Sequence, residues 1–341
     1  MTIKNLFLTI LGAFTLFTCD NDLNITADFE LIPVVYALID ANTETNYIRV
    51  EKGFLDPEVG GTVLAQIPDS LYFGPEVSVR ITNVRTGSAV TLERVNLVDE
   101  GFIREEGAFA TQPNIAYKLN TADLGMDVNE ILKLELIDQA DRIITEAETM
   151  VIGEHTISGS QPANPIRFRA DEDELSLGVR SDEQAAAIYD CRMLINYTEE
   201  NIQTGTQESK VLIWEIETGL ERERSNSSFR TLTVFRVQGQ EFFQFLGGNI
   251  EENPSISRTF NSIDLRFDAG GQDLLDYINI GNANTGITSN QIIPSFTNLN
   301  NNAVGIFSSR TTVRNIDPYG LNTQSRDSLR EGRFTAKLNF N

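Results

Sequence analysis

The chain has 341 residues and a formal net charge of −22, from 49 acidic and 27 basic side chains. Its length is suited to about two domains. The charge argues strongly against nucleic acid as a partner, and against docking on anionic lipid through a basic patch, because like charges repel.

The N-terminus has the parts of a secretory signal peptide. Lys4 precedes an apolar run over residues 6–17, and Cys19 follows. The run is too short to span a bilayer, so residues 1–18 predict a cleaved signal. The cysteine predicts lipoprotein processing, with acylated Cys19 heading a lipidated tether over 19–27. The alternative is an ordinary signal peptide that happens to contain a cysteine.

Residues 28–153 predict an immunoglobulin-like β-sandwich. About seven short apolar runs are separated by turn residues, which is typical of that fold. Residues alternate between apolar and polar over 77–82 and 132–136, as expected of a sheet with one wet face. We therefore expect one set to be buried and the other to face water: Val79, Ile81, Leu134 and Leu136 inside, Arg80 and Glu135 outside.

Residues 154–165 predict a linker, because glycine, serine and proline interrupt the pattern there. Beyond it, residues 166–341 predict a β-rich domain with a few short helices. The expected strands cover 166–168, 175–179, 187–197, 210–216 and 231–237, and the expected helices cover 240–246 and 272–278. The overall prediction is a mainly β protein.

The residue types that usually carry catalysis are scarce. The single histidine, His155, lies in the predicted linker, and Cys191 lies in an apolar run that predicts a buried, inert thiol. The acidic run 171–174 could hold calcium but is more typical of a solvated turn. Trp214 is expected in the core rather than on a sugar-binding surface. We predict no catalytic residue, cofactor or metal site.

Three segments resemble a known family. They are the apolar strand over 34–39, the strand-to-helix unit over 232–246, and a motif over 294–307 that includes Asn298 and Gly305. With the N-terminal cysteine, they make the chain similar to a family of Bacteroidota outer-membrane lipoproteins of unknown function, whose genes often neighbour TonB-dependent receptors. The motif departs from the family pattern at Asn302 and Ala303, near where glycine is usual. The resemblance implies an accessory role at the outer membrane.

Two tripeptides match the Asp-Ser/Thr-aliphatic pattern that Bacteroidota use for O-glycosylation in the envelope. They are centred on Ser70 and Ser328, each between an aspartate and a leucine. Both serines are therefore candidate O-glycosylation sites.

We expect a non-enzymatic lipoprotein of the outer membrane, held by its lipid anchor, that binds an outer-membrane receptor or transport protein. The alternative is a surface lipoprotein that captures glycans or other nutrients. A flat apolar patch would favour a protein partner, and a groove lined by exposed aromatic residues would favour capture.

Overall fold

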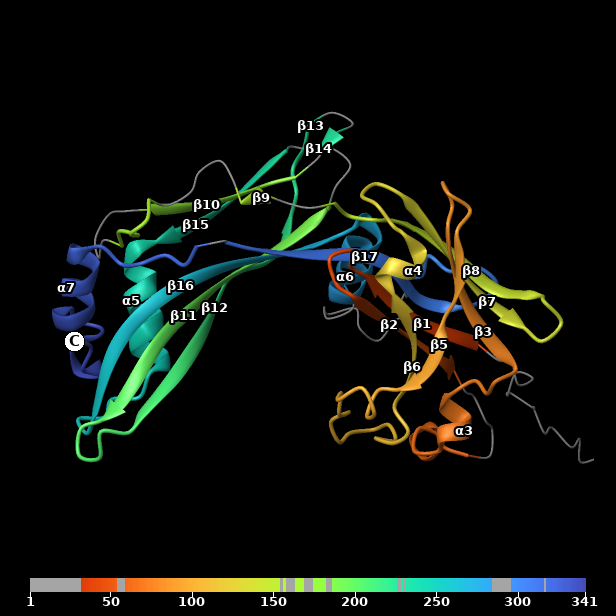
Figure 1. Cartoon of the computed structure of the whole chain (residues 1–341), viewed down its shortest axis with the longest axis horizontal. Helices are drawn as coiled ribbons and strands as arrows, with labels where there is room; N and C mark the ends of the chain where they lie inside the picture. Colours follow the sequence, from red (N-terminus) through yellow and green to blue (C-terminus); the bar gives the residue numbers. More distant parts are fainter. Residues whose placement is uncertain are drawn as a thin grey trace, which may run out of the picture.

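The protein is mainly β-strand, arranged as two lobes that share one long sheet (Figure 1). A computed structural model of the chain describes residues 32–53, 59–153, 156–157, 163–168, 174–181, 186–225, 228–229, 231–283, 296–315 and 317–341. The shared sheet has eight strands in the order β12-β11-β16-β17-β1-β2-β6-β5.

The first lobe is a β-sandwich. One layer is the β17-β1-β2-β6-β5 part of the long sheet, and the other is the sheet β4-β3-β7-β8. Its strands are β1 (Ile32–Ile39), β2 (Thr45–Gly53), β3 (Val77–Asn83), β4 (Ala89–Thr91), β5 (Glu93–Asn96), β6 (Ile115–Asn120), β7 (Ile131–Asp138) and β8 (Ile143–Met150). Three single-turn helices, α2 (Gly61–Leu64), α3 (Pro68–Leu71) and α4 (Thr121–Leu124), lie between strands.

The alternating strands bury the residues expected from the sequence. Val79, Ile81, Leu134 and Leu136 are each 0% exposed and pack in one core between the two layers. The immunoglobulin-like sandwich is therefore confirmed, as is the mainly β class of the whole chain.

Glu135 corrects one expectation. It points to the outer side of its sheet, as predicted, but it is only 6% exposed. The Arg80 Nε lies 2.9 Å from one carboxylate oxygen and the Lys133 Nζ lies 3.5 Å from the other. Burial raises the pKa of Glu135, but these two cations outweigh burial and its pKa is lowered. The long basic side chains cover the carboxylate instead of leaving it in water, and Arg80 itself remains partly exposed.

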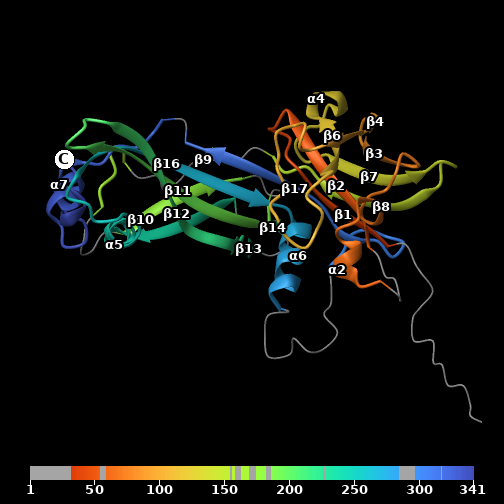
Figure 2. The same cartoon turned by 90° about the horizontal axis from the view of Figure 1, so that it is seen from below.

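One strand belongs to both lobes. The first part of β17 (Val304–Arg314) pairs in parallel with β1, from Val34 opposite Val304 to Ile39 opposite Ser309. Its last part pairs antiparallel with β16 (Ile256–Gly270), from Gly270 opposite Arg310 to Arg266 opposite Arg314. Figures 1 and 2 show this strand crossing from one lobe to the other. The sandwich therefore includes a strand far outside residues 28–153.

The second lobe is built on the long strands β11 (Ile188–Asn201), β12 (Gln207–Glu221) and β16. A smaller sheet, β15-β10-β9, and two helices cover their core face (Figure 1). The remaining elements are β9 (Thr156–Ile157), β10 (Glu174–Arg180), β13 (Arg224–Ser225), β14 (Ser228–Phe229), β15 (Leu232–Gln238), α5 (Gly239–Asn249), α6 (Gln272–Ala283), α7 (Thr323–Glu331) and the 3₁₀ turn η2 (Ala336–Leu338).

The two expected helices are confirmed as α5 and α6. A capping box begins α5, in which the Gln238 and Glu241 side chains each bind the other's backbone. The helix continues through Gly247 and Gly248, where the sequence predicted its end. Phe242, Phe243 and Leu246 on its inner face complete the core of the lobe, so packing outweighs the low helix propensity of glycine.

Candidate functional site

A pocket of about 250 Å³ is lined by residues of β1, β11, β16, β17 and α6. Figure 2 shows α6 where the two lobes meet. We call this pocket the junction pocket. Leu38, Ile188, Ala269, Leu274 and Ile278 form its apolar lining. Its charged lining consists of Asp190, Arg192, Arg266, Asp268 and Arg310.

Strand alternation places these charges on the outer face. On β16, Ile263, Leu265 and Phe267 are fully buried in the lobe core. Successive side chains of a strand point to opposite faces, so Arg266 and Asp268 point away from that core. The same alternation on β11 buries Cys191 and Met193, and turns Arg192 outward.

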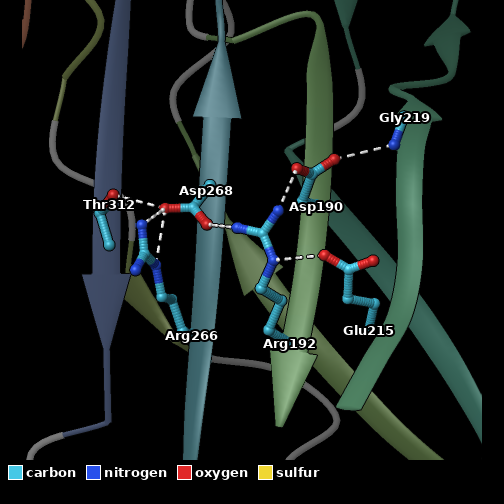
Figure 3. Close-up of polar contacts among 7 residues, drawn as sticks. All are labelled: Asp190, Arg192, Glu215, Gly219, Arg266, Asp268 and Thr312. Carbon is cyan, nitrogen blue, oxygen red and sulfur yellow. Dashed lines mark hydrogen bonds and ion pairs between the residues drawn. The ribbon is translucent and has the colours of Figure 1, made fainter. Parts of the chain in front are cut away.

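Asp268 is the centre of a charged network across the sheet (Figure 3). Its Oδ1 accepts hydrogen bonds from Arg266 Nε at 2.9 Å and Nη2 at 2.8 Å, and from the Thr312 hydroxyl. Its Oδ2 accepts from Arg192 Nη1. Three of these four donors share Oδ1, so Asp268 is held from both neighbouring strands, while Oδ2 accepts from Arg192 alone.

Arg192 links Asp268 to two further carboxylates (Figure 3). Its Nη2 lies 3.2 Å from Asp190, and its Nε lies 3.3 Å from Glu215 on β12. Burial lowers the pKa of Arg192, but the three acidic partners outweigh burial and raise it. Asp190 also accepts a hydrogen bond from the Gly219 backbone at 2.8 Å. The network therefore ties β12, β11, β16 and β17 together beside the pocket.

Arg310 differs from the other two arginines of the pocket. Its side chain is exposed, and no residue in the described part of the chain forms a hydrogen bond or ion pair with that side chain. The buried Asp40 interacts with it electrostatically. Burial raises the pKa of Asp40, while the Asn42 backbone amide and then Arg310 oppose that shift.

The free edge of β12 is a second candidate surface. Within the described ranges β12 pairs only with β11, so one side of this fifteen-residue strand has no neighbour. Val211 and Ile213 are 57% and 55% exposed on its outer face, while Leu212 and Trp214 pack on the core. An exposed edge of this length presents backbone donors and acceptors to any extended chain that approaches.

Several residues singled out in the sequence fall outside the described residues. These are Cys19, with the predicted signal and tether over 1–27, His155, and residues 171–173 of the acidic run. Among the described helices, none combines the length and hydropathy needed to cross a bilayer. No group of three or more potential metal-binding side chains comes together within the same ranges.

The two candidate glycosylation serines lie in helical turns. Ser70 is in α3 and Ser328 is in α7, and both are partly exposed. The Ser328 carbonyl accepts hydrogen bonds from the Gly332 amide and the Thr335 hydroxyl. These positions do not test whether either serine is glycosylated, so both sites remain predictions.

Two other expectations are confirmed. Cys191 is 0% exposed, and burial raises the pKa of its thiol far above the usual range. Trp214 packs against the core of the second lobe and stacks on Phe245 with ring centroids 5.2 Å apart.

The charged residues of the junction pocket were not singled out in the sequence. The run from Ile263 to Ala269 alternates strictly between apolar and charged residues, which is a strand signal with charges on one face. That signal identifies a wet face, but only the pairing of β16 with β11 and β17 brings the charges together.

No family model matches the chain, and no curated protein matches it. Among solved structures, a structure of a 1.5-MDa bacterial ice-binding adhesin has 10% identity and a TM-score of 0.19, covering 87% of this chain and 66% of that one. The C-terminal globular domain of the Pyrococcus abyssi oligosaccharyltransferase has 11% identity and a TM-score of 0.21, covering 84% of this chain and 44% of that one. The calcium-binding domain CBD12 of CALX1.1 has 8% identity and a TM-score of 0.17, covering 81% of this chain and 98% of that one. This chain thus spans less than two thirds of the first two structures, and at such TM-scores none of the three bears on its function.

Proposed function

We propose that the protein is a non-enzymatic lipoprotein of the outer membrane that binds another protein, as an accessory of a TonB-dependent transport system. The N-terminal segment and the family resemblance support the location. The free edge of β12 is the single observation that carries the binding role.

The chemistry of β12 suits an added strand. Val211 lies opposite Asn196, and Ile213 lies opposite the partly buried Leu194, so the outer face near the edge has a short apolar stretch between polar side chains. Four glutamates and one lysine lie along the strand, Glu208, Glu215, Glu217, Glu221 and Lys210. An extended segment with alternate apolar side chains and basic flanks would complement both features.

Site-specific photo-crosslinking tests this role. A photoreactive amino acid replaces Val211 in cells that make the full chain, and the adducts are identified by mass spectrometry after isolation of outer membranes. We expect an adduct with an outer-membrane receptor or transport protein. The control position is Val84, which is 50% exposed in the other lobe. Absence of adducts at position 211, or the same adducts at both positions, contradicts the proposal.

The anchor is tested separately with Cys19→Ser. We expect the variant to lose both a clickable fatty-acid label and membrane association, because no other cysteine is placed to take the lipid. A variant that keeps label and membrane association excludes the lipoprotein assignment. This result does not depend on the identity of the partner.

The alternative function is capture of glycans or other nutrients at the cell surface, and the junction pocket is the candidate site for a small nutrient. Small-molecule sites are concave and mostly apolar, with a few placed polar groups, as this pocket is. Mass spectrometry of small molecules released by denaturing protein purified from native membranes tests this alternative. If no small molecule is released in an amount stoichiometric with the protein, the result counts against the capture function.

A further inference from the structure

We propose that the junction pocket binds a small monocarboxylic acid with an apolar body, and that the Arg310 guanidinium forms the ion pair with its carboxylate. This inference concerns a different surface from the edge of β12 and does not depend on a protein partner.

The first step is the availability of Arg310. A guanidinium carries five N–H donors in a planar fork that matches a carboxylate. Asp268 lines the same pocket, but its hydrogen bonds are with Arg266, Arg192 and Thr312 and not with Arg310. Asp190 is engaged by Arg192 and by the Gly219 amide. Arg310 therefore faces the pocket with its donors unsatisfied by the described residues.

The second step is how the charges around the pocket pair. The lining has three arginines and two aspartates, and two further carboxylates lie nearby: Glu215 pairs with Arg192, and Asp40 interacts electrostatically with Arg310. The two aspartates and the other two arginines pair with one another. Within the described residues, Arg310 is the arginine of the lining whose side chain has no hydrogen bond or ion pair, and one guanidinium suits an anion of a single charge.

The third step is the apolar lining. Leu274 and Ile278 are four residues apart on α6, so they lie on one face of that helix. Leu38 and Ile188 come from the sheet opposite, while the Ala269 side chain belongs to the core of the second lobe. The lining is aliphatic, and its one aromatic residue, Tyr189, is only 1% exposed. Aliphatic walls bury a hydrocarbon body, whereas sugar recognition uses exposed aromatic faces, so an apolar acid fits better than a sugar.

Titration calorimetry with hexanoate as the probe and hexanamide as its neutral counterpart tests the proposal. The full chain carries Cys19→Ser, so that no acyl chain competes for the pocket. We expect hexanoate to bind with a dissociation constant on the order of 1 mM. We expect hexanamide to bind at least about tenfold more weakly, because it lacks the charge.

Three variants locate the site. Arg310→Gln should weaken hexanoate binding about tenfold or more, and Arg310→Lys should give an intermediate affinity because it keeps the charge but not the fork. Arg314→Gln is the matched control, since Arg314 is exposed on the same strand but does not line the pocket. It should bind within about twofold of the parent, which is well inside the effect of one charge-assisted bond. Unfolding in urea verifies that each variant is folded.

Four outcomes overturn the proposal. The first is that no hexanoate binds at a concentration roughly ten times the expected dissociation constant. The second is that hexanoate and hexanamide bind equally well, and the third is that Arg310→Gln binds hexanoate as the parent does. The fourth is that Arg310→Gln and Arg314→Gln lose the same affinity. The last would show a general charge effect in place of a specific site.

Discussion

The side-chain amide of Asn298 binds both backbone polar groups of Phe307. Its Nδ2 donates to the Phe307 carbonyl at 2.7 Å, and its Oδ1 accepts from the Phe307 amide at 3.0 Å. On this part of β17, β1 occupies one side, and β16 pairs only from Arg310 onward. The asparagine therefore takes the place of a neighbouring strand at a position where the sheet provides none.

Loss of the Asn298 amide should destabilise the protein. Asn298→Ala leaves a buried donor and acceptor of Phe307 unpaired, and we expect a loss of about 1–3 kcal/mol in the free energy of unfolding. Asn298→Asp places a carboxylate oxygen against the Phe307 carbonyl and a second charge beside Asp273, so it should be at least as destabilising as Asn298→Ala. Urea denaturation measures both, with Gln203→Ala, an exposed amide in a turn, as the control. Equal stability of Asn298→Ala and the control contradicts this role.

Gly305→Ala should be more disruptive. Gly305 has a φ of +115°, and an added Cβ would lie 2.0 Å from the Val35 carbonyl oxygen on β1. Backbone strain and overlap combine, so we expect a loss of about 3 kcal/mol or more, or failure to fold. Gly248→Ala in α5 meets no atom within 4 Å and serves as the control. A thermal melt that is unchanged in Gly305→Ala would show that β1 and β17 can separate at little cost.

Cys191 should be unreactive in the folded protein. Burial raises the pKa of its thiol, so the reactive thiolate is scarce at neutral and mildly alkaline pH. In a Cys19→Ser background, we expect iodoacetamide to label the chain only after urea is added. Cys191→Ser places a hydroxyl in an apolar core and should cost about 1–3 kcal/mol. Rapid labelling of the native chain is the result that would count against a buried thiol.

Glu130 should contribute to a loss of stability in acid. The Asp127 amide donates to its carboxylate and lowers its pKa; burial opposes this shift, and Arg85 and Asn83 lower the pKa further. The folded state therefore favours the ionised form. The contribution of Glu130 is present above its ordinary pKa of 4.5 and disappears as the pH falls through the lowered folded value.

The test compares the stability of Glu130→Gln in urea with that of the parent protein between pH 7 and pH 3. The variant should unfold at lower urea than the parent at pH 7, and the difference should shrink toward pH 3 as the parent's carboxylate is protonated. Glu148→Gln, at an exposed position on β8, is the control at each pH. A constant difference between parent and Glu130→Gln from pH 7 to pH 3 rules out this linkage.

Strand periodicity predicted where the chain is buried better than it predicted which strands pair. The alternation around Val79 and Leu134 identified the core side of the sandwich correctly, because burial on one face depends only on local period. The prediction that Glu135 faces water was wrong for a non-local reason, because Arg80 on the neighbouring strand covers its carboxylate. The long strand β16 was missed, although residues 263–269 carry the signal of a half-buried strand.

The sequence by itself determined the mainly β class, the sandwich core, two helices and a buried Cys191, because each depends on the order of apolar and polar residues along a short segment. Only the tertiary structure decided that β17 joins both lobes. It also decided that, among the described residues, β12 has a free edge and the Arg310 side chain lies in the pocket with Asp268 but without a hydrogen bond or ion pair. These features arise between residues up to about 270 positions apart, such as Val34 and Val304. The free energy of each pairing depends on partners that no local pattern identifies, so the candidate sites appear only once the sheets are assembled.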